Sequence, residues 1–83
     1  MRRHEHIEPG DICEIVEIHP ENAFYERKEK FIGKRVVVEK IYNERTAEAW
    51  LDVDVVLLDD IYPYKKGREI PLYKAKLKRI DVN

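Results

Sequence analysis

The 83-residue chain contains no serine and no glutamine, and threonine, cysteine and methionine occur once each. Without serine, every mechanism that uses a serine nucleophile is excluded, and no G-x-x-x-x-G-K-[ST] loop is present to hold nucleotide phosphates. A single cysteine excludes an intramolecular disulfide and a zinc cage built from cysteines. No apolar run approaches the roughly 18 residues of a membrane-spanning helix. These absences point away from an enzyme and from a cofactor.

The chain is rich in charged residues. Charged residues make up 40% of the chain and hydrophobic residues 43%, with 16 Lys/Arg against 17 Asp/Glu. The length fits one small domain with a modest core. Few amides and thiols beside abundant Lys, Arg and Glu are typical of heat-adapted proteins, so we expect a thermophilic source, cellular or viral. The polar start, residues 1–7, predicts no signal peptide and therefore a cytoplasmic protein, in the host cytoplasm if it is viral.

Strand signals dominate the chain, because β-branched residues and period-two alternation recur along it. In the first predicted strand the alternation is imperfect: Ile12, Val16 and Ile18 fall on one face, while Cys13 and Ile15 fall on the other. This pattern indicates either a bulge or a strand covered on both faces. The predicted strands are Asp11–His19, Lys34–Tyr42, Ala49–Leu57 and Ile70–Ile80, with a short extended piece at Ile61–Tyr64.

Residues 21–32 are the one stretch with helical spacing, and we expect a long loop there with about one turn of helix. Gly33 follows, where the loop must turn sharply into a valine-rich strand, and we expect it to adopt a positive φ. Short strands without a substantial helix predict a mostly β protein. We expect a single SH3-like antiparallel barrel over residues 1–83, with about five strands and residues 1–8 as a flexible extension.

The order of residues between positions 10 and 34 resembles a pattern in small bacterial and phage proteins of uncharacterised function, "GDxVxIxxIxP…YYxxRxxxIGK". The resemblance implies an SH3-like barrel and no transferable catalytic residues. Phe24 departs from the pattern, which has an aromatic hydroxyl there. SH3-like barrels as a class mostly bind RNA, proteins or peptides, which supports only an analogy. The matching segments are Gly10-Asp11-Ile12, Ile15–Ile18, Pro20, Ala23-Phe24-Tyr25, Arg27 and Ile32-Gly33-Lys34.

Charge is divided unevenly along the chain. Residues 1–60 carry nine basic and fifteen acidic side chains, whereas residues 61–83 carry seven basic and two acidic ones. On a strand, Lys74, Lys76 and Lys78 would repeat every ~6.6–6.8 Å, a comb that could follow a phosphate backbone. Alternatively, these lysines protect an edge strand and pair with nearby aspartates. Those aspartates are Asp52, Asp54, Asp59 and Asp60.

The same aspartates do not predict a metal site, because no close-spaced oxygen ligands with a glycine turn are present. His4 and His6 are two residues apart, a spacing that binds Zn²⁺ or Ni²⁺ only adventitiously. Cys13 and His19 would lie roughly 20 Å apart on an extended strand, too far for a thiolate–imidazole pair. We therefore expect neither metal nor catalysis.

The eight aromatic residues exceed what so small a core requires. Trp50 lies opposite the apolar row of its strand, which indicates an exposed anchor for a partner or a residue covered by a barrel end or by the loop. The leading hypothesis is a non-enzymatic module that acts through protein contacts or self-association. The alternative is a barrel that binds RNA or DNA through its basic C-terminal strand. The predicted binding residues are Trp50, Tyr62, Tyr64, Lys74, Lys76, Lys78 and Arg79.

Overall fold

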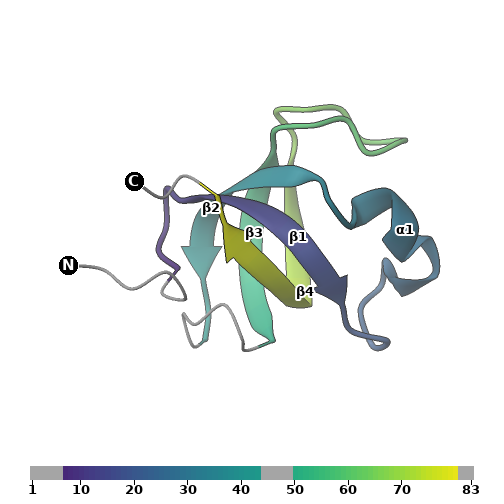
Figure 1. Ribbon diagram of the computed structural model, residues 1–83, viewed down its shortest axis with the longest axis horizontal. Coiled ribbons are helices and arrows are strands. Elements are labelled where there is room, and N and C mark those ends of the chain that lie inside the picture. The colour runs from purple at the N-terminus through teal and green to yellow at the C-terminus, as the bar shows by residue number, and fades with distance from the viewer. Residues whose placement is uncertain (1–6, 44–49, 81–83) are drawn as a thin grey trace.

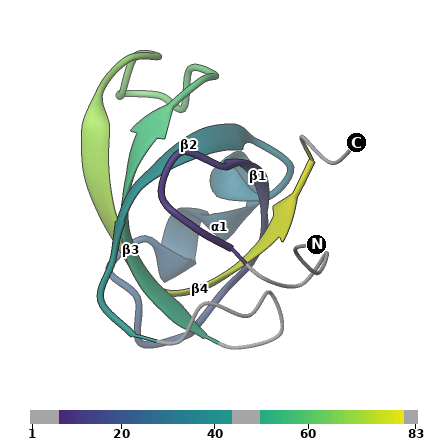
Figure 2. The same ribbon diagram turned by 90° about the vertical axis from the view of Figure 1, so that its left-hand side faces the viewer.

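A computed structural model of the chain describes residues 7–43 and 50–80. Its four strands pair in the order β1-β2-β3-β4 and close into an antiparallel barrel, which Figure 2 shows as a ring. A 3₁₀ turn and one turn of α-helix connect the first two strands at one end of the barrel (Figure 1). The elements are β1 (Ile12–Ile18), η1 (Tyr25–Arg27), α1 (Lys28–Phe31), β2 (Arg35–Ile41), β3 (Leu51–Leu57) and β4 (Glu69–Arg79).

The predicted mostly β, closed antiparallel fold is confirmed, with four strands where about five were expected. The difference lies in the extended piece at Ile61–Tyr64, which forms only an isolated bridge between its own two ends. The strand β4 bends and pairs with two neighbouring strands. Its first part pairs with β3 from Glu69 to Ala75, with a register shift between Asp52 and Leu51 of β3, and its second part pairs with β1 from Ala75 to Arg79. Lys74 lies at the register shift as an extra residue with φ 60°. Such a bulge sharpens the local twist, and here it lets one strand turn the corner that closes the barrel.

The barrel interior is filled by sixteen apolar side chains, each at most 4% exposed. β3 supplies the regular alternation that its sequence predicts, with Leu51, Val53, Val55 and Leu57 all pointing inward. Placing such aliphatic side chains in the core contributes roughly 1.5–3 kcal/mol each relative to leaving them exposed. The hydrophobic alternation of β3 therefore accounts for its orientation.

β1 contains the bulge that its irregular pattern suggested. Its register against β4 shifts between Ile15 and Glu17. The shift places Ile18 inside the barrel with Cys13 and Ile15, while Val16 is 39% exposed. The first of the two alternatives for this strand is therefore correct, and the grouping of Ile18 with Val16 on one face is wrong.

Residues 21–32 form the expected loop with a short helical segment. Phe31, at the end of α1, is fully buried and packs into the end of the barrel. Gly33 follows with φ +90°, and its N–H donates a 2.8 Å hydrogen bond to the carbonyl of Ile15. The predicted positive φ is confirmed, and it allows the chain to turn from α1 into β2.

The barrel begins before the expected boundary at residue 8. Ile7 is fully buried in the core, and the backbone N–H of Glu8 donates to Oδ2 of Asp11 at 2.9 Å. Residues 1–6 of the predicted flexible extension, and with them His4 and His6, lie outside the described residues. Within the two described segments, no helix has the length and apolar character needed to cross a membrane.

Candidate binding surfaces

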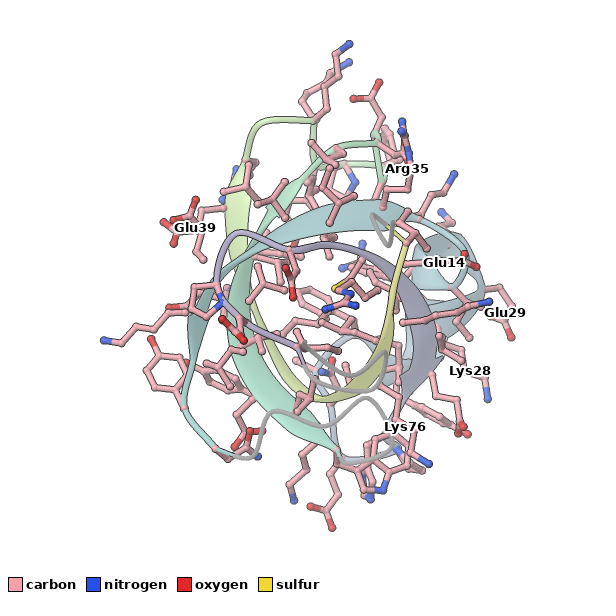
Figure 3. All side chains as sticks on the ribbon, turned by 60° about the vertical axis from the view of Figure 1, so that its left-hand side comes forward. Glu14, Lys28, Glu29, Arg35, Glu39 and Lys76 are labelled. Atoms are coloured by element: carbon pink, nitrogen blue, oxygen red, sulfur yellow. The ribbon has the colours of Figure 1, made fainter. Side chains whose placement is uncertain are left out.

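The lysines of β4 lie on the outside of the barrel, each facing a glutamate. Nζ of Lys74 forms an ion pair with Glu21, and Nζ of Lys76 lies 3.8 Å from Oε2 of Glu17. Lys78 is the cross-strand neighbour of Glu14, whose side chain, like that of Lys76, points outward in Figure 3. The hydrogen bond from Lys74 also lowers the pKa of the Glu21 carboxyl. The lysines of β4 therefore lie beside carboxylates that β1 and the long loop supply.

The side chains of the β4 lysines pair with glutamates and not with the four aspartates that the sequence suggested. Those aspartates accept other hydrogen bonds. Asp52 accepts the backbone N–H of Lys74 at 2.9 Å, and so satisfies the bulge in β4. Asp60 accepts a backbone N–H in the loop after β3 at 2.8 Å. Asp54 accepts the phenolic O–H of Tyr42 at 2.5 Å, which raises the pKa of that tyrosine to about 12. These carboxylates are occupied by structural donors.

Asp59 pairs with Arg35 at the start of β2. The guanidinium donates to both carboxylate oxygens, at 2.8 and 3.3 Å, and the backbone N–H of Arg35 adds a third hydrogen bond at 2.8 Å. These bonds lower the pKa of Asp59 to about 2. Figure 3 shows Arg35 projecting from the barrel near the loop that follows β3. The pair ties this loop to β2.

Arg79, one of the predicted binding residues, does not lie on the outer surface. It is 7% exposed and occupies an inward position in β4, opposite the buried Cys13. The bulge at Lys74 shifts the alternation so that Ala75, Leu77 and Arg79 share the inner face. The prediction that Arg79 joins the lysines as a surface contact is therefore wrong.

Trp50 precedes β3 and is half-buried. Its ring makes an edge-to-face contact with His19 at a centroid distance of 4.9 Å, and Nζ of Lys76 lies 4.7 Å from its centroid. Trp50 is therefore neither a fully exposed anchor nor a fully covered residue, because a histidine and a lysine cover part of its ring. His19 packs against this ring, while Cys13 lies inside the barrel.

A pocket of about 370 Å³ opens beside the bend of β4. Tyr73, 48% exposed, stands at its edge and makes an edge-to-face contact with Tyr42, also 48% exposed, at 5.8 Å between centroids. Sequence reasoning missed both tyrosines as site residues. The pocket is lined by Glu21, Asn22, Ala23, Phe24, Asp52, Pro71, Tyr73 and Lys74.

The pocket wall is held by hydrogen bonds between the 19–24 segment and the β4 bulge. The side-chain amide of Asn22 donates to the carbonyl of Tyr73, and its oxygen accepts the N–H of Phe24 at 2.6 Å. The N–H of His19 donates to the carbonyl of Lys74 at 2.9 Å. Because these bonds satisfy the irregular backbone at the bulge, they fix the loop against the sheet.

The two remaining predicted residues, Tyr62 and Tyr64, lie in the loop between β3 and β4. Tyr62 is 78% exposed, and the Tyr62–Pro63 peptide bond is cis. Tyr64 is half-buried and makes an edge-to-face contact with Phe24, with 6.0 Å between centroids. Ile61, fully within the core, anchors this loop through paired backbone hydrogen bonds with Tyr64 of 2.9 and 2.6 Å.

Among the described residues, no group of three His, Cys, Asp or Glu side chains is arranged to hold a metal ion. In the comparisons with known proteins, no family model, no curated protein and no solved structure matches this chain. The resemblance to bacterial and phage SH3-like barrels therefore stays a prediction.

Proposed function

We propose that the protein is a non-enzymatic binding module that holds a short segment of a partner protein in the pocket beside the β4 bend. The observation that carries the proposal is an open, apolar pocket with two half-exposed tyrosines, Tyr42 and Tyr73, beside it. Binding sites in proteins are commonly concave, largely apolar and edged by a few polar groups. Tyrosine is also among the residues that contribute most to protein interfaces.

The charges around the pocket favour a basic partner. On the outer face of the sheet, Asp52 of β3 lies opposite Tyr73 of β4. Two residues further along β3, Asp54 lies opposite Pro71. The pocket lining therefore holds two carboxylates, those of Glu21 and Asp52, against one lysine, Lys74, and Asp54 lies nearby on β3. A segment that combines lysine or arginine with apolar residues would complement both the carboxylates and the apolar part of the lining.

The pocket also has the rigidity that affinity requires. Its wall is held by the hydrogen bonds that join Asn22 and His19 to the β4 bulge. A preformed wall does not have to be ordered when the partner binds, which reduces the entropic cost of association.

The test is selection of short random peptides against the purified protein. We expect the selected peptides to be enriched in basic and apolar residues. Tyr73→Ala should weaken their binding by at least about tenfold, as expected for an aromatic interface residue. Tyr62→Ala is the matched control, because it removes another exposed tyrosine outside the pocket. Selected peptides that bind both variants as well as the wild type, or no enrichment at all, would contradict the proposal.

A nucleic-acid site on the outer face of β4 is not favoured by this geometry. Phosphate binding needs cations that are free to replace the counterions of the nucleic acid. Lys74 and Lys76 instead lie against Glu21 and Glu17.

A further inference from the structure

A second aromatic surface lies where the η1–α1 segment meets the loop after β3. The α1–loop patch consists of Arg27, Lys30, Tyr62, Tyr64 and Arg68. The guanidinium carbons of Arg27 and Arg68 lie 5.9 and 5.2 Å from the centroid of Tyr64, and Nζ of Lys30 lies 5.6 Å from that of Tyr62. Each cation is thus held next to a ring by a cation–π contact.

Within residues 7–43 and 50–80, no carboxylate forms an ion pair with a cation of the α1–loop patch. The ion pairs of these segments include Arg35–Asp59, Lys74–Glu21 and Lys76–Glu17, all of them outside the patch. Lys65 and Lys66, both exposed, lie in the same loop and add to its positive charge. Of the two aspartates of the loop, Asp59 binds Arg35 outside the patch, and Asp60 accepts the backbone N–H of Lys66 within the loop.

The patch rests on the core rather than on freely moving side chains. Phe24 stacks on the fully buried Phe31 with 4.7 Å between centroids, and its other ring contacts are with Tyr64 and Arg27. Ile61 anchors the loop from the other side. The guanidinium groups are therefore positioned before any ligand arrives, and the ring of Tyr62 remains 78% exposed.

We propose that the α1–loop patch binds single-stranded nucleic acid, with phosphates held by Arg27 and Arg68 and a base stacked on Tyr62. Single-strand binding combines cations that follow the backbone with aromatic rings on which unpaired bases stack. A duplex has its base faces covered by neighbouring pairs, so it would use the cations but not the exposed ring. An acidic peptide would likewise pair its carboxylates with the cations of the patch, but it would not need the ring of Tyr62 for binding.

This site is independent of the pocket proposed for a protein partner, although Phe24 adjoins both. Binding is measured by fluorescence anisotropy with labelled oligouridylate and oligothymidylate of about 12 nucleotides, a length within the site sizes of small barrels. Duplexes of the same length and a labelled polyglutamate peptide are the comparison probes. We expect single strands to bind best at about 50 mM salt, with log K falling by about 0.7 per phosphate contact as log salt rises.

Two double variants with the same net charge locate the site. Lys30→Gln with Arg68→Gln removes two exposed cations from the patch, and Lys74→Gln with Lys78→Gln removes two exposed cations from β4. The first should weaken single-strand binding by at least about tenfold and make the slope of log K against log salt shallower by about 0.7 for each cation that binds a phosphate. The second should change binding by less than about twofold. Tyr62→Ala should weaken it by at least about fivefold, the low end of base–aromatic stacking.

Several results would overturn the proposal. These are the absence of single-strand binding at low salt, equal losses in the two double variants, and a greater loss in the β4 variant. Polyglutamate that binds as tightly as the oligonucleotides, with Tyr62→Ala leaving both unchanged, would instead identify an acidic protein segment as the partner. Because Tyr62 and Arg68 are exposed, substitutions there leave the core intact, and circular dichroism of the variants should match that of the wild type.

Discussion

Two basic regions of the molecule differ in whether carboxylates lie next to their cations. On β4, Lys74 and Lys76 lie beside glutamates of the long loop and of β1, and Lys76 also lies over the ring of Trp50. In the α1–loop patch, Arg27 and Arg68 lie beside the ring of Tyr64. An aromatic ring positions a cation without cancelling its charge, whereas a carboxylate cancels it. Positive charge available to a ligand therefore depends on these neighbours more than on the number of basic residues in a segment.

The position of the α1–loop patch depends on the core. The patch rests on Phe31 through Phe24, so Phe31→Ala should have the largest effect. We expect it to lower the free energy of unfolding by about 3–5 kcal/mol, as for other buried phenylalanines. Denaturant titration followed by tryptophan fluorescence measures it. An effect below about 1 kcal/mol would show that the end of the barrel repacks around the gap.

Gly33 sets the direction in which the helical segment joins β2, and with it the position of the patch. A Cβ at Gly33 would meet no atom within 4 Å, so the cost of substitution lies in the backbone, at φ +90°. Gly33→Val should destabilise the protein by more than about 1 kcal/mol, because a β-branched residue fits that region poorly. The exposed neighbour provides the control: Ile32→Val should stay within about 0.5 kcal/mol. A Gly33→Val protein that melts within about a degree or two of the wild type would refute this.

Removing the carboxylates should make the two regions more alike. Glu17→Gln with Glu21→Gln frees Lys76 and Lys74 without changing the size of either side chain. We expect single-strand affinity to rise about threefold to tenfold at ~50 mM salt and the gain to disappear at ~1 M, where screening is nearly complete. The melting temperature should stay nearly unchanged, since both pairs are exposed and such surface ion pairs contribute little to stability. An unchanged affinity would mean that the glutamates do not limit binding on β4.

The smallest effect concerns Asp59, whose pairing with Arg35 holds the base of the patch loop. Its pKa of about 2 in the folded state lies below the ordinary value of 3.8, so the pairing stabilises the folded protein above about pH 4. The contribution should be lost as the pH falls from about 4 to about 2. Asp59→Asn should therefore lower the melting temperature at neutral pH and leave it nearly equal to that of the wild type near pH 2. A difference that persists at low pH would contradict the role of the ionised pair.

Much of the barrel follows from local patterns. The alternation in β3 placed Leu51 and Val55 correctly, and the turn at Gly33 followed from its position between a loop and a strand. Which side chains of β4 face the core was not predicted, although the apolar residues of the strand contain the information. Ile70 and Leu72 share one phase while Ala75 and Leu77 share the other, which requires an extra residue between them.

The partners of the charged side chains were beyond sequence reasoning. Glu21 lies 53 positions from Lys74, and closure of the barrel brings the two together. Arg27 and Arg68 meet at Tyr64 for the same reason, so neither residue stood out in its own segment. Side-chain contacts between distant segments depend on register and bulges, and a shift of one residue moves a side chain to the other face.

The most direct test of the difference between the two basic regions is a backbone amide NMR titration of the protein with oligouridylate. We expect chemical-shift changes at Arg27, Lys30, Tyr62 and Arg68, and none of similar size at Lys76 or Lys78. Changes centred on the β4 lysines, or spread evenly over both regions, would contradict the proposed difference.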